Sequence, residues 1–230
     1  MRLLDLFCGA GGAAEGYYRA GFTSIVGVDN KSQRNYPFEF VQDDALDYLE
    51  GLMFDRRETF FDAIHASPPC QAYSITRHSH NAEHPDLLPA TRDLLKRSGL
   101  PYVIENVPGA PMPGAIVLCG AAFNLRAHDS ATGLDLWLRR HRLFESNVPL
   151  MGPGGCMCRG KEIGGVYGGG SSDRNHARNV RRGGYTPGAQ VRKELMGIGW
   201  MTQDELSQAI PPAYTEFVGR QVLEHKWRVA

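Results

Sequence analysis

Long apolar runs are missing from this sequence, and none approaches the roughly 20 residues that a membrane-spanning helix needs. The N-terminus lacks the charged segment, long apolar core and cleavage site of a signal peptide. The five cysteines form an odd, scattered set rather than a disulfide framework. We therefore expect a cytoplasmic protein without membrane contact, and 230 residues suffice for one large α/β domain.

Net charge is also absent, because 25 lysines and arginines balance 25 aspartates and glutamates. The two halves differ, however: residues 1–137 hold 11 basic and 17 acidic residues, and residues 138–230 hold 14 and 8. Within 139–193 the count is 11 against 3, and nine of the eleven are arginine. The planar guanidinium suits phosphates and guanine edges. A solvated face is the alternative, but this Gly-rich segment favours a nucleic-acid partner.

Apolar segments that alternate with helical patterns predict an α/β fold with a mostly parallel sheet. Strands are expected at residues 2–7, 23–28, 38–41, 61–66, 101–104 and 115–119. Helices are expected at 13–20, 45–51, 85–98, from about 202, and at 213–225. Residues 138–144 are predicted to form an edge strand with Arg140 and Arg142 on one face. No periodic element is evident from 147 to about 184.

Two strand ends indicate a site for an adenosyl group. The first strand runs directly into a Gly-rich turn at residues 8–12 and then a helix, and such turns let a ligand approach bare backbone. The second strand leads to Asp29, 17 residues after Gly12, where a carboxylate can accept hydrogen bonds from both ribose hydroxyls. These features do not separate NAD from S-adenosylmethionine. Asp43 and Asp44 follow the third strand, where a carboxylate can bind an adenine amine, cap the next helix, or do both.

The centre of the pattern is Cys70, which follows Pro68 and Pro69 after the fourth strand. Prolines stiffen a turn and remove backbone donors, so this loop can hold one thiol in one place. We interpret Cys70 as a nucleophile rather than as a small buried hydrophobe. Glu105 follows the fifth strand, which places a carboxylate beside the same presumed cleft.

No metal site is expected from the sequence. His78, His80 and His84 lie in a polar loop without cysteine or carboxylate ligands at fixed spacing. Cys156 and Cys158 lack a second ligand pair.

Taken in order, these motifs resemble the DNA (cytosine-5) methyltransferases. The similarity lies in Asp5-Leu6-Phe7-Cys8-Gly9-Ala10-Gly11-Gly12, Pro69-Cys70-Gln71, Glu105-Asn106-Val107, Arg140-His141-Arg142, and a last motif from Ala209 to Gly219. The resemblance implies a Rossmann-like fold for S-adenosylmethionine-dependent methyl transfer, with helices on both faces of the sheet. It implies cofactor contacts from Phe7, Gly9, Ala10, Gly11, Gly12, Asp29, Asn30, Asp44, Ala45 and Pro69. The catalytic residues that it implies are Cys70, Glu105, Arg140 and Arg142.

The implied activity is that of a DNA (cytosine-5-)-methyltransferase, in which Cys70 adds covalently to cytosine and Glu105 assists at ring N3. The target base would leave a double-stranded helix, and the protein would act as a monomer. Residues 1–145 would form the cofactor-binding and catalytic domain, 146–184 a short basic target-recognition segment, and 185–230 a segment that returns to the catalytic domain. The chain departs from the family pattern at Leu138 and Gln208, and the short recognition segment predicts a short target or relaxed specificity.

Three alternatives remain at this point. The acceptor could be cytosine in RNA or in a single strand. The chain could be a non-catalytic nucleic-acid binder, although such a protein would need neither Cys70 nor Glu105. It could also be an NAD-dependent oxidoreductase with a redox-active Cys70, although no nicotinamide-handling residues stand out.

Overall fold

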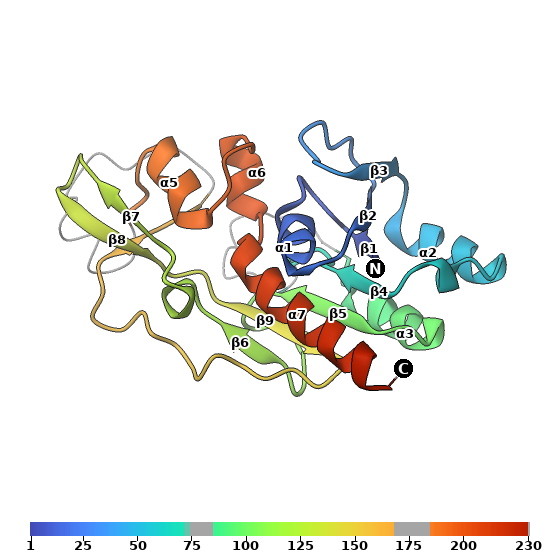
Figure 1. Ribbon diagram of the computed structural model, residues 1–230. Coiled ribbons are helices and arrows are strands. Elements are labelled where there is room, and N and C mark those ends of the chain that lie inside the picture. The colour runs from blue at the N-terminus through green and yellow to red at the C-terminus, as the bar shows by residue number, and fades with distance from the viewer. Residues whose placement is uncertain (72, 74–84, 168–184, 230) are drawn as a thin grey trace.

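The computed structural model describes residues 1–71, 73, 85–167 and 185–229. Its main feature is a seven-stranded sheet in the order β3-β2-β1-β4-β5-β9-β6 (Figure 1). The first five strands of this order pair in parallel, and β9 pairs antiparallel with both β5 and β6. The strands are β1 (Arg2–Leu6), β2 (Ser24–Asp29), β3 (Glu39–Gln42), β4 (Ala63–Ala66), β5 (Tyr102–Asn106), β6 (Ile116–Leu118) and β9 (Arg142–Ser146).

Helices cover both faces of this sheet, as the α/β pattern predicts. They are α1 (Gly12–Ala20) and α7 (Pro212–Val229) on one face and α2 (Ala45–Phe54) and α3 (Leu88–Ser98) on the other. Two further helices, α5 (Ala189–Met196) and α6 (Gln203–Gln208), pack against a smaller sheet instead. Alternation along β1 divides the core: Leu3 packs with residues of α1 and α7, whereas Leu4 and Leu6 pack with residues of α2 and α3. Among the described residues, no helix is both long enough and apolar enough to span a membrane.

The C-terminal helix α7 closes the face of the sheet that α1 also covers (Figure 1). The Thr215 hydroxyl donates a hydrogen bond to the carbonyl of Ala13 at 2.9 Å. Gly16 makes the close approach possible, because a Cβ at this position would overlap Thr215 Oγ1 and the carbonyl oxygen of Pro212. The helix that ends the sequence is therefore seated directly on the helix that follows the Gly-rich turn.

We expect Gly16→Ala to destabilise the protein by about 1–3 kcal/mol, because the added methyl group meets the backbone of Pro212 and Glu216 as well as the Thr215 hydroxyl. Gly51→Ala is the matched control, since Gly51 lies in α2 with open space where its Cβ would stand. That change should be neutral or stabilising, because alanine favours a helix over glycine by about 1 kcal/mol. Urea unfolding of the two variants measures the difference, and equal stability would contradict the packing of α1 against α7.

A smaller sheet stands beside the main one, in the order β10-β8-β7. Its strands are β7 (Arg126–Asp129), β8 (Leu134–Leu138) and β10 (Ile163–Gly164). Leu136 and Leu138 pack there with Leu195 of α5 and Leu206 of α6, which forms a third core. The boundary expected between 145 and 146 lies inside β9, and the smaller sheet takes strands from both sides of it.

The prediction of one edge strand over residues 138–144 is wrong. The chain leaves β8 at Leu138 and enters β9 only at Arg142, so residues 139–141 join two different sheets. Strand β9 also lies between β5 and β6 rather than at an edge. No glycine or proline marks the junction in the sequence, and only long-range pairing reveals the break.

Candidate active site

The residues singled out in the sequence gather at one edge of the main sheet, because β1 to β5 run parallel and end there. The Gly-rich turn follows β1, Asp29 ends β2, and Asp44 follows β3. The Pro-Cys loop follows β4, and Glu105 lies near the end of β5.

The Gly-rich turn has a conformation that exposes its backbone. Phe7, Gly9 and Gly11 all have positive φ, at 56°, 49° and 83°. A non-glycine residue in this region is strained, and such strain concentrates at ligand sites. The indole of Trp200 donates to the carbonyl of Ala10 at 3.0 Å, so the C-terminal segment holds the turn. Gly12 begins α1 and packs against the backbone of Ile210.

Asp29 lies at the tip of β2 beside this turn. Its Oδ2 accepts the N–H of Gly9 and its Oδ1 accepts the N–H of Lys31, both at 3.0 Å. Each carboxylate oxygen has a further lone pair, so two ribose hydroxyls could still donate to Asp29. The exposed Asn30 follows directly.

Asp44 caps α2, which confirms one of its two predicted roles. The N–H groups of Leu46 and Asp47 donate to the same oxygen, Oδ1, at 2.9 and 3.2 Å. The other oxygen thereby stays available to an amine donor such as that of adenine. Ala45 is buried in the first turn of α2. Carboxylate acceptors at these two strand ends fit the hydroxyl and amine donors of an adenosyl group.

The Pro-Cys loop is held by Asn106, a residue whose role the sequence analysis missed. Asn106 is buried, and its amide donates to the carbonyl of Pro68 at 3.1 Å. Its own side-chain oxygen accepts the N–H of Val107. The side chain thus connects the loop before Cys70 to the residue after Glu105.

Cys70 is half-buried, with Glu105 and Arg142 close enough to affect its ionisation. Burial raises the pKa of the thiol above its ordinary value, and the negative charge of Glu105 raises it further. Arg142 and Arg140 oppose this rise. The thiol is therefore mainly protonated at neutral pH, and its proton must leave as it attacks a substrate.

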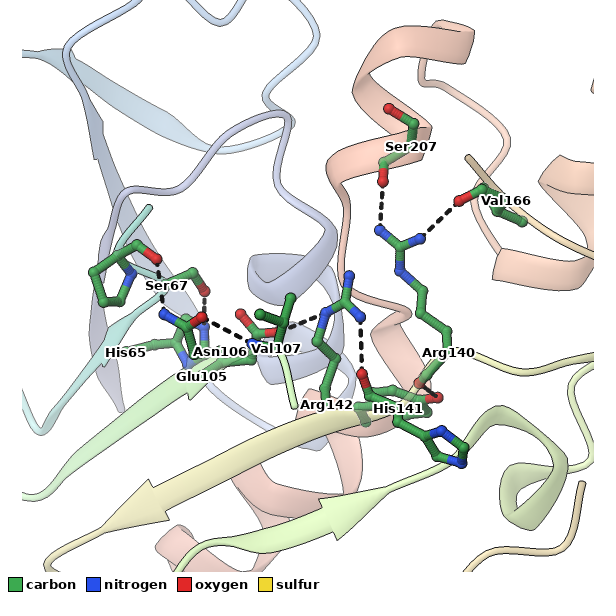
Figure 2. A network of polar contacts seen from close by, with 12 residues as sticks. His65, Ser67, Glu105, Asn106, Val107, Arg140, His141, Arg142, Val166 and Ser207 are labelled. Atoms are coloured by element: carbon green, nitrogen blue, oxygen red, sulfur yellow. Dashed lines mark hydrogen bonds and ion pairs between the residues drawn. The ribbon is translucent and has the colours of Figure 1, made fainter. Parts of the chain in front are cut away.

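Glu105 is buried, and Arg142 Nε lies 2.9 Å from its Oε1 (Figure 2). Burial raises the pKa of this carboxyl group, although Arg142, Arg140 and the Ser67 hydroxyl act in the opposite direction. Apart from the ion pair, Oε1 accepts no hydrogen bond from the residues that the structure describes. A buried carboxyl group with a raised pKa can present its proton to a ring nitrogen.

A chain of hydrogen bonds near Glu105, formed by Tyr17, His65 and Ser67, was not expected from the sequence. Tyr17 Oη lies 3.0 Å from His65 Nδ1, and His65 Nε2 lies 2.8 Å from Ser67 Oγ. Burial lowers the pKa of His65 to about 3, so the imidazole is neutral. His65 thereby orients Ser67 without adding a charge next to Glu105 (Figure 2).

Arg140 points away from this pair. Its guanidinium donates to the carbonyls of Val166 and Ser207 at 2.9 and 2.6 Å, and its own carbonyl accepts the hydroxyl of Tyr214 (Figure 2). Arg140 therefore connects the chain before β9 to the region of the smaller sheet, to α6 and to α7. Because residues 139–141 lie outside the strand, Arg140 and Arg142 do not share a strand face.

Two predicted segments cannot be placed. The loop with His78, His80 and His84 lies outside the described residues, as do residues 168–184, which hold four of the eleven basic residues within 139–193.

Part of the chain is similar to known methyltransferases. Residues 1–111 match the family model described as C-5 cytosine-specific DNA methylase, which confirms the resemblance over that part of the chain. The curated relative "Type II methyltransferase M.AgeI" of Thalassovita gelatinovora is 29% identical over 133 residues. That match covers 51% of this chain but only 30% of the relative.

Solved structures confirm the predicted fold class. The Entamoeba histolytica methyltransferase EhMeth superposes with a TM-score of 0.58 at 12% identity, over 97% of this chain and 98% of that one. The S. pombe Dnmt2 methyltransferase gives the same TM-score at 13% identity and the same coverage of both chains. The chain thus has a methyltransferase fold, with a mostly parallel sheet and helices on both faces.

Proposed function

We propose that the protein is a DNA (cytosine-5-)-methyltransferase that uses S-adenosylmethionine. The observation that carries this proposal is the grouping of the Cys70 thiol with the buried Glu105–Arg142 pair at the carboxyl end of the sheet. The match of residues 1–111 to cytosine-5 methylases supports the same reaction. An NAD-dependent oxidoreductase would have no need of a buried Glu105 carboxyl group beside the Cys70 thiol.

The reaction begins at Cys70. Carbon 5 of cytosine becomes nucleophilic only after a nucleophile adds to carbon 6. The Cys70 sulfur forms this bond as its proton leaves, and Glu105 shares a proton with ring N3 as negative charge develops there. Arg142 fixes the position of the Glu105 carboxyl group. After carbon 5 has gained the methyl group, a base removes its proton, the bond to sulfur breaks, and the Cys70 thiol is regenerated.

S-Adenosylmethionine supplies the methyl group when it is bound. The Gly-rich turn from Phe7 to Gly12 and Pro69 would line its methionine part, Asp29 and Asn30 would hold the ribose, and Asp44 and Ala45 would contact the adenine. Because the reacting carbon must enter this cleft, we propose that the target base leaves the double helix. Residues 146–184 would then contact neighbouring base pairs, and the protein would act as a monomer.

Asp29→Ala should weaken binding of S-adenosylhomocysteine by about 1–3 kcal/mol, because charged hydrogen bonds to the ribose are lost. Asp93→Ala is the control, since it removes an equal charge from the exposed surface of α3. Isothermal titration calorimetry compares the two, with Asp29→Asn included to preserve an acceptor for the N–H of Gly9. Unchanged affinity in Asp29→Ala would count against this placement of the ribose.

Nucleoside mass spectrometry tests the function itself. The protein is incubated with S-adenosylmethionine and, in parallel, with double-stranded DNA, single-stranded DNA or RNA of the same sequence. We expect 5-methylcytosine in double-stranded DNA above the other two acceptors. Methylation confined to RNA or single strands would show that double-stranded DNA is not the acceptor. Methylation at N4, or no methylation under any condition, would contradict the proposed reaction.

A further inference from the structure

Four ligand-type side chains meet at the end of β6, away from Cys70 and Glu105. They are Cys119, His141, Cys156 and Cys158, and their ligand atoms all lie within 4.8 Å of one another. The Sγ atoms of Cys119 and Cys156 are 3.8 Å apart, and His141 Nε2 lies 3.2 Å from Cys156 Sγ and 3.8 Å from Cys158 Sγ. The reaction proposed above uses none of these side chains.

Strand register explains how the first two ligands meet. Strands β6 and β9 are antiparallel, with Val117 opposite Leu143 and Leu118 opposite Arg142. Cys119 directly follows Leu118 and His141 directly precedes Arg142, so both ligands lie just beyond the same end of this pairing. The two ligands are therefore brought together by the same pairing that positions Arg142.

The other two ligands come from a tight loop in the connection between β9 and β10. Cys156 and Cys158 are flanked by Gly154, Gly155 and Gly160, all of which have positive φ. The N–H of Cys158 points to Cys156 Sγ at 3.5 Å, as expected where a loop folds around a thiolate. The glycines allow the sharp turns that direct both sulfurs towards the end of the sheet.

We propose that these four residues bind one structural Zn²⁺ ion. Three thiolates and one imidazole form a closed tetrahedral set that suits zinc. With Zn–S bonds of about 2.3 Å, two sulfur ligands stand about 3.8 Å apart, which is the separation of Cys119 and Cys156. The sulfurs of Cys156 and Cys158 are 2.9 Å apart and would separate by somewhat less than 1 Å around the ion.

The ion would stabilise a connection with little other structure. The described residues 147–162 include no helix or strand. The side chain of Gln221 is among the few groups that bind the backbone of this connection, at Met151. The site also includes His141, whose carbonyl accepts a bond from Arg142 Nη1 at 2.8 Å. Zinc would thus fix both the connection to the smaller sheet and the backbone that carries Arg142. A metal site was not expected from the sequence, because the four zinc ligands come from three segments that are far apart in the chain.

Metal analysis of the untagged protein, purified with a reducing agent and without added metal, tests the proposal. We expect about one zinc per chain by plasma mass spectrometry, with Cys156→Ser/Cys158→Ser falling to background. Cys70→Ala is the matched control, because it removes a thiol outside the cluster and should retain the full zinc content. Chelator treatment should lower the Tm of wild type and of Cys70→Ala but not that of the double variant.

Cobalt substitution makes the ligands visible. Co²⁺ added to the metal-free wild type should give the visible bands of a tetrahedral site together with a thiolate charge-transfer band, and the double variant should give neither. Two results would overturn the proposal. The first is a wild-type protein that contains no zinc, whether its thiols are free or mass spectrometry shows a Cys156–Cys158 disulfide. The second is a double variant that keeps its zinc.

Discussion

Cys70→Ala should abolish methyl transfer, with activity reduced to background in the assay for methylated nucleosides. The mechanism divides a difficult substitution into two easier steps through a covalent bond from sulfur to carbon 6. Among nearby groups, the hydroxyl of Ser67 is scarcely ionised near neutral pH and is already hydrogen-bonded to His65. It cannot replace the thiolate. Cys70→Ser should be equally inactive.

The variant must still fold and bind its cofactor for this result to be informative. Cys70 is half-buried in a loop fixed by Asn106 rather than in a core cluster, so its loss should leave Tm and S-adenosylhomocysteine binding close to wild type. DNA with 5-fluorocytosine should trap a covalent complex with wild type, because fluorine replaces the proton that departs. Cys70→Ala should form none. A variant that methylates cytosine near the wild-type rate would exclude Cys70 as the nucleophile.

The sequence predicted much of the fold because its signals are local. The strands β1 to β5 appear as short apolar runs, and glycine or proline marks the turns that follow β1 and β4. Since parallel strands end at one edge, ordering these runs was enough to expect the Gly-rich turn, Asp29, Cys70 and Glu105 at a common site.

Features set by long-range pairing were missed or misjudged. The chain from Leu138 to Phe144 has the pattern of one strand, yet it crosses between two sheets, and this crossing sends Arg140 to Val166 and Ser207. The support that Asn106 gives to Pro68 depends on the neighbouring position of β4 and β5. In the same way, the Cys119–His141 pairing requires the β6–β9 register, which no local pattern reveals.

Glu105→Gln should slow methyl transfer by several orders of magnitude while making Cys70 more reactive. The amide can at most donate a hydrogen bond to ring N3, because its N–H groups are not acidic and cannot give up a proton as negative charge develops there. Meanwhile the charge of Glu105 raises the pKa of the Cys70 thiol. Removing that charge lowers the pKa, so more thiolate is present at a given pH.

Two measurements on the same variant should therefore move in opposite directions. Alkylation of Cys70 by iodoacetamide, followed by mass spectrometry, should reach its midpoint at a lower pH in Glu105→Gln than in wild type, whereas methylation should fall. Glu145→Gln is the matched control: it makes the same chemical change on β9, but Glu145 pairs with Arg92 at 2.7 Å and does not act on Cys70. Its alkylation profile should follow wild type. If Glu105→Gln leaves methylation intact, Glu105 does not assist at ring N3. If it shifts the alkylation midpoint to higher pH, the charge of Glu105 does not raise the pKa of Cys70.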